Sequence, residues 1–381
     1  MRLLYLSLSY VPSRRASAVH VMKMCAALAR QGHQVELITK RCPPRQEPGV
    51  EDDHRFYGVE PIFRLDKLPR PAWRGGGLVY SLALERRLRR ARREAGTTVF
   101  SRDLFGAWRS VRLGLPTIFE AHGLPKTARA TRWHRELFAS PHLERLVVIS
   151  QALAERFEGL GLLPPADRLL VAHDAADPMA VAEPRTPPWN EPQIGYIGHL
   201  YPGRGVEVIV ALAERLPQCS FHLVGGRRED VERWRATTAL PNLTFHGFVA
   251  PGELADHYGR FDILLMPYQR KVGVASGKTD TSGWMSPMKM FEYLATGRPI
   301  VSSDLPVLRE VLRDEDNALL VAPEDVDGWA QAIQRLLDDG PLARRLGEQG
   351  ERDFRDHYTW DARARAVLDG LGSSAAESPR R

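Results

Sequence analysis

The sequence predicts an α/β protein with two doubly wound domains, each a parallel β-sheet with helices on both faces. Its 381 residues suit two domains of about 100–200 residues each. Short, almost wholly apolar segments alternate with segments of helical periodicity, and strands that are apolar on both sides are typical of parallel sheets with covered faces. Four prolines fall within residues 183–192, which interrupts regular structure and predicts a linker there.

The first domain, expected over residues 1–182, begins with a strand, a helix and a second strand. Apolar residues at positions i, i+3, i+4 and i+7 indicate the helix, namely Val21, Met24, Cys25 and Leu28. Ser150 is expected to cap a later helix over residues 151–157. Apolar runs bounded by polar residues predict strands at 2–9, 34–39, 116–120 and 143–149.

The second domain, expected over residues 193–356, continues the alternation. Its predicted strands are 193–197, 220–224, 243–245, 262–266, 299–302 and 318–321. Its predicted helices are 206–216, 252–258, 287–295, 307–312 and 326–337. A helix within residues 357–371 is expected to return to the first domain, and residues 372–381 are expected to be a disordered tail.

Composition and charge limit the kind of protein. Apolar residues make up 43% and charged residues 26%, which is typical of a globular protein. The three cysteines, Cys25, Cys42 and Cys219, are far apart and indicate neither a disulfide framework nor a zinc site, so a reducing compartment is favoured. No apolar run approaches the ~20 residues of a membrane span, and the opening residues do not resemble a secretory leader.

The net charge of +6 is unevenly distributed. Residues 1–183 carry +10 and residues 184–381 carry −4, so the first half is expected to face an anionic partner. Residues 85–93 place six arginines beside a leucine stripe, which is compatible either with an anionic membrane surface or with a solvated face. Nucleic-acid binding is not expected, because no stacking platform or recognition motif accompanies the charge.

The most informative stretch is residues 284–299. Ser286 is expected to be the N-cap of a helix, with Pro287 at the first helical position. Lys289 then falls in the first turn, where a cation opposes the helix dipole unless an anion such as a phosphate binds there. Glu292 lies on the same face and is able to accept hydrogen bonds from ribose hydroxyls. The alternative is a surface ion pair between Lys289 and Glu292.

Two further stretches place polar residues after predicted strands. In residues 195–205, Gly198 and Gly203 allow close approach of a ligand, and Arg204 stands at the start of a helix, where it is able to bind a phosphate. His122 follows a strand of the first domain, where ligands of such sheets bind, and is therefore a candidate site residue. The alternative is that this histidine has only a structural role. Residues 273–279 resemble a phosphate-binding P-loop but have the wrong glycine spacing, so a glycine and serine loop able to close over phosphates is expected instead.

With these stretches the chain resembles the retaining glycosyltransferases of family 4, which have the GT-B fold of two Rossmann-like domains facing a cleft. The resemblance covers most of the chain and is loosest around residues 41–115. Five motifs carry it by their order and spacing, at residues 198–205, 221–226, 242–248, 262–267 and 286–301. It implies an acceptor-binding first domain and a nucleotide-sugar-binding second domain.

The resemblance also implies roles for single residues. Arg204 would bind the donor diphosphate, Glu292 the ribose, and His122 would lie near the transferred sugar; with Lys289 these are the expected catalytic residues. The expected donor-binding residues are Gly198, His199, Arg204, Gly247, Phe248, Ser286, Pro287, Met288, Lys289 and Glu292. The Gly247-Phe248 turn would lie beside the base, and the loop at residues 12–19 beside the donor phosphates or the acceptor.

Several positions depart from the family pattern. His199 stands where the family usually has its first phosphate-binding arginine, and Trp284 where it has the first of two paired glutamates. Ser17 and Ala18 replace the glycines of the first loop, and Asp174-Ala175 replaces an Asn-Gly. Lys289 is expected to restore part of the lost positive charge.

Taken together, the residues and the resemblance predict a metal-independent enzyme without a cofactor that moves a sugar, with retention, from a nucleoside diphosphate, most simply UDP or GDP. A lipid-linked or polysaccharide acceptor is favoured, in the cytoplasm and peripherally at the inner membrane face, with a small soluble acceptor as the alternative. A non-catalytic relative that binds a nucleotide sugar or a partner protein, motivated by His199 and Trp284, and a sugar-nucleotide epimerase remain open.

Overall fold

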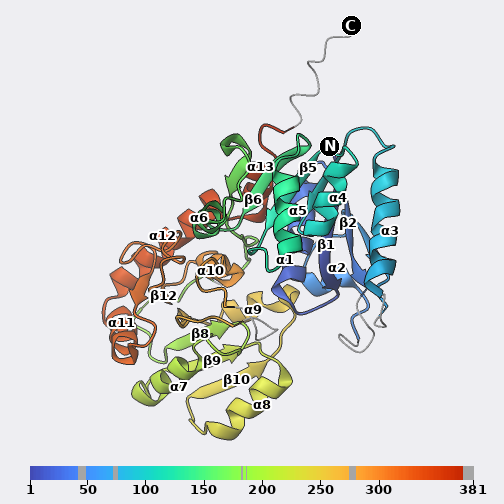
Figure 1. Ribbon diagram of the computed structural model, residues 1–381. Coiled ribbons are helices and arrows are strands. Elements are labelled where there is room, and N and C mark those ends of the chain that lie inside the picture. Colours follow the sequence, from blue (N-terminus) through green and yellow to red (C-terminus); the bar gives the residue numbers. More distant parts are fainter. Residues whose placement is uncertain (42–48, 72–75, 182, 186, 274–279, 372–381) are drawn as a thin grey trace. The chain divides into compact units, whose positions relative to one another are not determined.

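The computed structural model describes residues 1–41, 49–71, 76–181, 183–185, 187–273 and 280–371, and they form two compact units. The first unit contains Met1–His173 together with the C-terminal residues from Trp360 onward, and the second contains Asp174–Thr359. Each is a parallel sheet with helices, so the predicted α/β class is confirmed (Figure 1).

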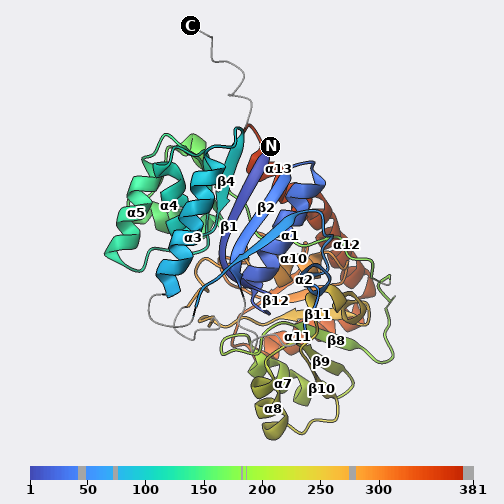
Figure 2. The same cartoon turned by 90° about the vertical axis from the view of Figure 1, so that its right-hand side faces the viewer.

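The first unit has a seven-stranded sheet in the order β3-β2-β1-β4-β5-β6-β7. Its strands are β1 (Arg2–Val11), β2 (Gln34–Arg41), β3 (Arg64–Leu68), β4 (Thr97–Ser101), β5 (Thr117–Ala121), β6 (Leu143–Val148) and β7 (Leu169–Val171). Its helices are α1 (Ala16–Arg30), α2 (Asp53–Tyr57), α3 (Gly76–Ala91), α4 (Leu104–Arg112), α5 (Ala128–Phe138), α6 (Gln151–Gly159) and α13 (Trp360–Leu368). Helices lie on both faces of the sheet, with α1 on one side and α3, α4 and α5 on the other (Figure 2).

The second unit has a six-stranded sheet in the order β10-β9-β8-β11-β12-β13. Its strands are β8 (Gln193–Ile197), β9 (Ser220–Val224), β10 (Leu243–Gly247), β11 (Ile263–Met266), β12 (Ile300–Ser303) and β13 (Leu319–Val321). Its helices are α7 (Val206–Arg215), α8 (Arg228–Thr237), α9 (Ala255–Tyr258), α10 (Met288–Leu294), α11 (Val326–Asp338) and α12 (Gly340–His357).

The strand order places a functional edge in each sheet. The order reverses between β1 and β4 in the first unit and between β8 and β11 in the second. Ligands of doubly wound sheets bind outside the carboxyl ends of the strands at such a reversal. The loops after these four strands, and after the neighbouring β5, are therefore the places to look for a site.

Local sequence explains most of the elements. The expected strands at 193–197 and 220–224 are confirmed at both ends, and β1 is buried along most of its length. Ser150 caps α6 as predicted, because its side chain accepts a hydrogen bond from the backbone N–H of Leu153 at 3.1 Å. The edge strand β3 was not predicted, since its residues are largely half-buried and polar.

One predicted helix is wrong. Residues 307–312 form single turns rather than a helix. The side chain of Asn317 accepts a hydrogen bond from the Arg313 N–H at 2.7 Å and donates one to the Val311 carbonyl at 3.1 Å. These side-chain bonds take backbone groups that a continuing helix would have used for itself.

The boundary between the units differs from the expected one. The change falls after His173 rather than after residue 182, and the described residues of 183–192 group with the second unit. The guanidinium of Arg185 forms two hydrogen bonds with the carboxylate of the buried Asp262, which fastens this stretch to the second unit. The expected tail at 372–381 lies outside the described residues.

The C-terminal helix α13 belongs to the first unit, as its red ribbon among the blue and green elements shows (Figure 1). Arg30 of α1 donates to the carboxylate of Asp361 at 2.8 Å. Arg145 of β6 donates to three backbone carbonyl oxygens near the end of α13, those of Ala366, Val367 and Asp369.

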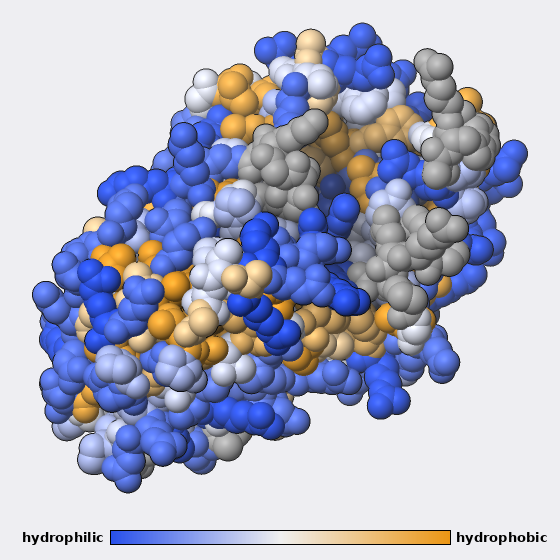
Figure 3. Space-filling view, turned by 90° about the horizontal axis from the view of Figure 1, so that it is seen from below, coloured by the Kyte–Doolittle hydropathy of each residue, from blue (hydrophilic) through white to orange (hydrophobic). Residues whose placement is uncertain are grey.

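The apolar character of the helices and of the surface bears on membrane insertion. Within the part of the chain that is described, no helix has the length and apolarity that a transmembrane span needs. On the face drawn in Figure 3, hydrophobic residues form patches among hydrophilic ones.

Candidate functional site

The first candidate site lies at the strand-order reversal of the second unit, where the loops after β8 and β11 meet the start of α10. Gly198 follows β8 directly and has a φ of +155°. A Cβ at this position would stand 2.8 Å from the Nζ of Lys289, so a side chain here would collide with the ammonium group. The glycine therefore lets the loop approach Lys289 closely.

Lys289 is the central cation of this site. It lies in the first turn of α10, as predicted, and its Nζ is 3.8 Å from the ring centroid of Tyr196 and 5.1 Å from that of Tyr268. The buried Nζ has no hydrogen-bond partner among the described residues. Burial, and then the charge of Arg204, lower the pKa of Lys289 well below its ordinary value, while Glu292 opposes this shift. The alternative of a surface ion pair is thus excluded by burial.

Arg204 converges on the same tyrosine. It lies just before α7, and its guanidinium donates to the Tyr268 hydroxyl at 2.9 Å and to the Gly273 carbonyl at 3.2 Å. Its carbon Cζ is 5.1 Å from the Tyr268 ring centroid. Two cations thus lie on one aromatic residue that directly follows the β11 segment. Like charges held this close favour an anion between them.

His199 contributes no positive charge at neutral pH. Burial, followed by the charges of Arg204, Lys289 and Arg227, lowers the pKa of His199 to about 4. Its ring stacks on Tyr201, with centroids 4.6 Å apart and planes at 13°. A neutral ring at this position is able to stack or hydrogen-bond but leaves the charge of the site to Arg204 and Lys289.

Glu292 lies one turn beyond Lys289 on α10. Its Oε2 accepts a hydrogen bond from the Tyr258 hydroxyl at 2.8 Å. The carboxylate is close enough to Lys289 to raise the pKa of that amine. Tyr258 is buried, so it orients Glu292 from the protein side.

The predicted cap of α10 is wrong. The helix begins at Met288, and Pro287 is the N-cap residue with an extended backbone rather than the first helical residue. Ser286 makes no cap, because its hydroxyl accepts a hydrogen bond from the backbone N–H of Asp174 at 2.8 Å. Ser286 therefore holds the first residue of the second unit.

Backbone contacts align the loops after β8, β9 and β10 at this edge. The Gly198 N–H donates to the Val224 carbonyl at 2.9 Å, and the Gly225 N–H donates to the Gly247 carbonyl at 2.7 Å. Gly247 has a φ of +80°, which favours glycine, and half-buried Phe248 follows it. The loop expected to close over phosphates falls at residues 274–279, outside the described residues.

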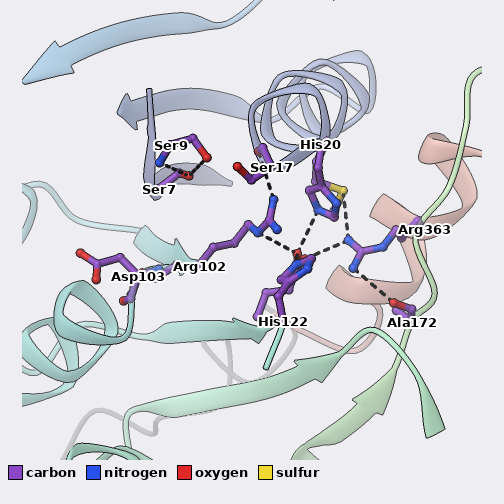
Figure 4. A network of polar contacts seen from close by, with 12 residues as sticks. Ser7, Ser9, Ser17, His20, Arg102, Asp103, His122, Ala172 and Arg363 are labelled. Carbon is purple, nitrogen blue, oxygen red and sulfur yellow. Dashed lines mark hydrogen bonds and ion pairs between the residues drawn. The ribbon is translucent and has the colours of Figure 1, made fainter. Parts of the chain in front are cut away.

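The second candidate site lies in the first unit, around the carboxylate of Glu120 on β5. His122 directly follows this strand, as predicted, and its Nε2 is 2.5 Å from Glu120 Oε1. The Nε2 of His20, from α1, is 2.9 Å from the same oxygen, and Arg102 Nε is 3.4 Å from it. Arg363 Nη1, from α13, is 2.9 Å from the other oxygen, Oε2 (Figure 4).

Electrostatics set the ionisation of this group. Burial alone would raise the pKa of Glu120, but Arg363, His20 and the hydrogen bond from His122 hold it well below its usual value. Burial and the charge of Arg102 lower the pKa of His122 to about 4. The His122 side chain is 25% exposed, whereas that of Glu120 is inaccessible, so only the imidazole is open to a ligand.

Sequence reasoning identified His122 but missed its partners. The available signal was a carboxylate inside the otherwise apolar segment 117–121, since a buried charge needs a counter-charge. The counter-charge is Arg363, which is 243 residues from Glu120 in the chain, so no local sequence pattern indicates it.

His20, Glu120 and His122 bring together side chains of the types that bind metal ions. Within the described residues, one ligand atom of each lies within 4.8 Å of the others. Both carboxylate oxygens are already contacted by guanidinium groups, at 2.9 Å from Arg363 and 3.4 Å from Arg102. Two fixed cations oppose a third, so the cluster is better described as an ion-pair network than as a metal site.

Comparisons with known proteins agree with this fold. The chain is 25% identical over 410 residues to a D-inositol 3-phosphate glycosyltransferase of Xylanimonas cellulosilytica, covering 95% of this chain and 93% of that protein. It is 23% identical over 406 residues to a glycogen synthase of Mycobacterium tuberculosis, covering 96% and 93%.

Two solved structures share the architecture. HepE of Anabaena, solved in complex with UDP-glucose, superimposes with a TM-score of 0.70 at 15% identity, covering 98% of this chain and all of that one. Sucrose-phosphate synthase of Thermosynechococcus elongatus gives 0.67 at 20% identity, covering 95% and 96%. These matches assign the GT-B fold.

Two family models match successive parts of the chain. The model described as Glycosyltransferase Family 4 matches residues 17–178, and the model described as Glycosyl transferases group 1 matches residues 191–339. Each match falls almost wholly within one of the two units. The predicted resemblance is therefore confirmed, and the chain belongs to the family 4 glycosyltransferases.

Proposed function

We propose that this protein transfers a sugar from a nucleoside diphosphate sugar to an acceptor, with the donor diphosphate bound between Lys289 and Arg204. The observation that carries the proposal is the buried Lys289 ammonium, which has no hydrogen-bond acceptor among the described residues. A buried cation without an acceptor is costly, and a diphosphate would supply both the acceptor and the counter-charge.

The two cations also suit the step in which the diphosphate leaves the sugar. Negative charge develops on the diphosphate as the bond to the sugar breaks, and fixed positive groups lower the barrier by stabilising it. Arg204 is already held by Tyr268 and Gly273, so it needs little reorganisation. Because these side chains supply the charge, the proposed reaction needs no metal ion and no cofactor.

The other site residues take supporting roles in this proposal. Glu292, oriented by Tyr258, accepts hydrogen bonds from the ribose, and His122 bonds the transferred sugar. The donor-binding edge includes Gly198, Gly247 and Phe248, which align the loops beside the base. The UDP-glucose bound to HepE supports UDP as the first nucleotide to test, with GDP second.

Retention of configuration is proposed through attack on the same face that the diphosphate leaves. A double displacement would need a free carboxylate nucleophile beside the sugar. The carboxylate nearest to His122 is Glu120, which is inaccessible to solvent and bonded on both oxygens. The departing diphosphate would therefore take the acceptor proton itself, so that the acceptor oxygen replaces the phosphate oxygen at the anomeric carbon.

The acceptor is proposed to be lipid-linked or a polysaccharide at the cytoplasmic membrane face. Leu78 and Leu82 on α3 are 66% and 53% exposed, and the same helix carries a run of arginines. Three of these arginines, Arg87, Arg89 and Arg90, are paired with carboxylates, which weakens the attraction to anionic lipid. One relative is named for phosphatidyl-myo-inositol, which is a lipid, and another for D-inositol 3-phosphate, which is a small soluble molecule, so a small soluble acceptor is the rival.

The donor proposal is tested by release of nucleoside diphosphate from UDP-, GDP- and ADP-sugars, with and without a chelator. Turnover by the parent that persists in chelator and is lost in Lys289→Ala and Glu292→Ala would support it. Tight nucleotide binding with no turnover over a broad acceptor panel would favour a non-catalytic relative. An isomerised donor without acceptor would favour an epimerase. The anomeric configuration of the product, read by NMR, tests retention.

The membrane proposal is tested by sedimentation with vesicles that contain anionic lipid. The parent is expected to bind, and a Leu78→Ser, Leu82→Ser double variant to bind more weakly. Equal recovery of both proteins in the supernatant would contradict membrane docking through α3 and favour the soluble acceptor.

A further inference from the structure

Arg363 contacts two segments of the first unit that are far apart in the sequence, at Glu120 and at Ala172–His173. Its Nη1 donates to Glu120 Oε2 at 2.9 Å, and its Nε donates to the His173 carbonyl at 2.7 Å. Its Nη2 donates to the Ala172 carbonyl at 3.3 Å. Ala172 and His173 are the last residues before the chain enters the second unit, and α13 begins where the chain returns from it.

Glu120 is surrounded by groups from every element packed against it. His20 and Cys25 face it from α1, Tyr5 from β1, Arg102 from the end of β4, and His122 from its own strand end. Arg363 contacts Oε2, whereas His20, Arg102 and His122 contact Oε1 (Figure 4). The carboxylate is therefore held from both sides.

This arrangement determines which nitrogen of His122 carries the proton. An ionised carboxylate only accepts hydrogen bonds, so His122 Nε2 must donate to Glu120. The neutral ring then has its lone pair on Nδ1. Because His122 is partly exposed while Glu120 and Arg363 are buried, the effect of the buried pair reaches the surface through this one ring.

We propose that Arg363 is a positioning residue for His122: by holding Oε2 of Glu120, it orients the carboxylate whose Oε1 fixes the ring and its tautomer. The inference deepens the proposed function, on which it rests for the role of His122 in the reaction. It also assigns a role to the returning C-terminal helix, which supplies the guanidinium to a site more than 200 residues earlier in the chain.

An arginine suits this position better than a lysine. The planar fork reaches the carboxylate and both carbonyl oxygens at once, while an ammonium is a point charge with less directional control. Arg363→Lys should therefore preserve charge and part of the orientation, and Arg363→Met should preserve only the aliphatic packing. Arg145 provides a matched control, because it also holds α13 to the unit but bonds only backbone carbonyls of that helix.

The first test is independent of activity. In protein with ¹⁵N-labelled histidine, His122 is assigned by comparison with His122→Gln, and its tautomer and titration are followed. The parent is expected to show the Nε2–H form and a pKa near 4. In Arg363→Met the pKa should rise and the tautomers should mix, since Glu120 loses its strongest partner; Arg363→Lys should be intermediate. An unchanged His122 spectrum in Arg363→Met, or the same change in Arg145→Met, overturns the proposal.

The second test uses turnover. Arg363→Met is expected to lower kcat by about 10- to 100-fold while the donor KM changes by less than about twofold, because the donor-binding cations belong to the other unit. Arg363→Lys should recover part of kcat. Thermal unfolding is measured in each variant, and if Arg363→Met does not fold, Arg363→Lys takes its place in both tests.

The two proposals fail in distinguishable ways. A parent without turnover of any nucleotide sugar would refute the proposed function, while the histidine spectra would still decide whether Arg363 positions His122. A parent that turns over, with normal kcat in Arg363→Met and in Arg363→Lys, would refute the positioning role alone.

Discussion

The two units have charged centres at the same kind of place, the carboxyl edge of a doubly wound sheet, but the central charge is balanced by an opposite charge in direct contact in only one of them. In the first unit, Glu120 lies between Arg363 and Arg102 and accepts hydrogen bonds on both oxygens. In the second, Lys289 and Arg204 converge on Tyr268, and the ammonium has no acceptor among the described residues. A balanced centre holds a side chain in place, whereas a centre of like charges needs a ligand to complete it.

The largest effect is expected from removing the counter-charge of the balanced centre. Glu120→Gln keeps the shape of the side chain but leaves the buried Arg363 uncompensated, which should lower the free energy of unfolding by about 3–5 kcal/mol. Urea unfolding measures this loss. Glu94→Gln is the control, because Glu94 is partly exposed and its ion pairs with Arg2 and Arg90 should contribute at most about 1 kcal/mol each. Equal losses in the two variants would contradict the comparison.

Acid should weaken both centres through their partly buried histidines. His122 and His199 have a pKa of about 4 in the folded protein, below the ordinary value of 6.5. Between these values the unfolded chain binds more protons, so stability is full above about pH 6.5 and falls as the pH drops toward 4. Each histidine should account for a loss on the order of 3 kcal/mol.

The control for this acid effect is an exposed histidine, His142. Urea midpoints measured from pH 7 to pH 4 should fall less steeply in His122→Gln and His199→Gln than in the parent. His142→Gln removes an exposed histidine and should leave the slope unchanged. Parallel slopes in all four proteins would show that neither centre carries the dependence.

A smaller and opposite effect is expected in the unbalanced centre. Lys289→Met removes an ammonium group whose Nζ is buried without a partner among the described residues, so the unliganded protein should be at least as stable as the parent. The affinity for UDP or GDP should fall about 10- to 100-fold, since a charged hydrogen bond contributes about 1.5–3 kcal/mol. Thermal unfolding without nucleotide measures the stability of the unliganded protein, and the shift on adding nucleotide measures the change in affinity. Lys271→Met, at an exposed position of the same unit, should keep the shift; loss of the shift there would point to a general charge effect.

The smallest effect is the uptake of a proton when nucleotide binds. The pKa of Lys289 is well below its ordinary value in the free protein, and a bound diphosphate should raise it. Over the range between the two values, binding takes up a proton and the affinity falls as the pH rises. Titration calorimetry in two buffers of different ionisation enthalpy measures the uptake. Lys289→Met should abolish it, and an unchanged uptake would place the proton elsewhere.

Fold prediction succeeded where each segment carries its own signal. The wholly apolar, buried β11 and the periodic α7 were recognised from their own residues, and β5 and β9 were recognised as mostly apolar runs. The edge strand β3 was missed, because one face of it is not covered. Ser286 was assigned to the wrong partner, since a cap and a tertiary hydrogen bond to Asp174 need the same hydroxyl and local sequence does not choose between them.

The alternation of strands and helices, the family, and the placement of Arg204, Lys289 and His122 relative to their elements could be predicted from local sequence. The surroundings of these three side chains depend on residues that folding brings together. Tyr196 of β8 and Tyr268 of the loop after β11 lie beside Lys289, and Arg363 reaches Glu120 across 243 residues. Periodicity reflects the burial of a segment's own faces, whereas the charge that balances a buried group comes from wherever the folded chain places it.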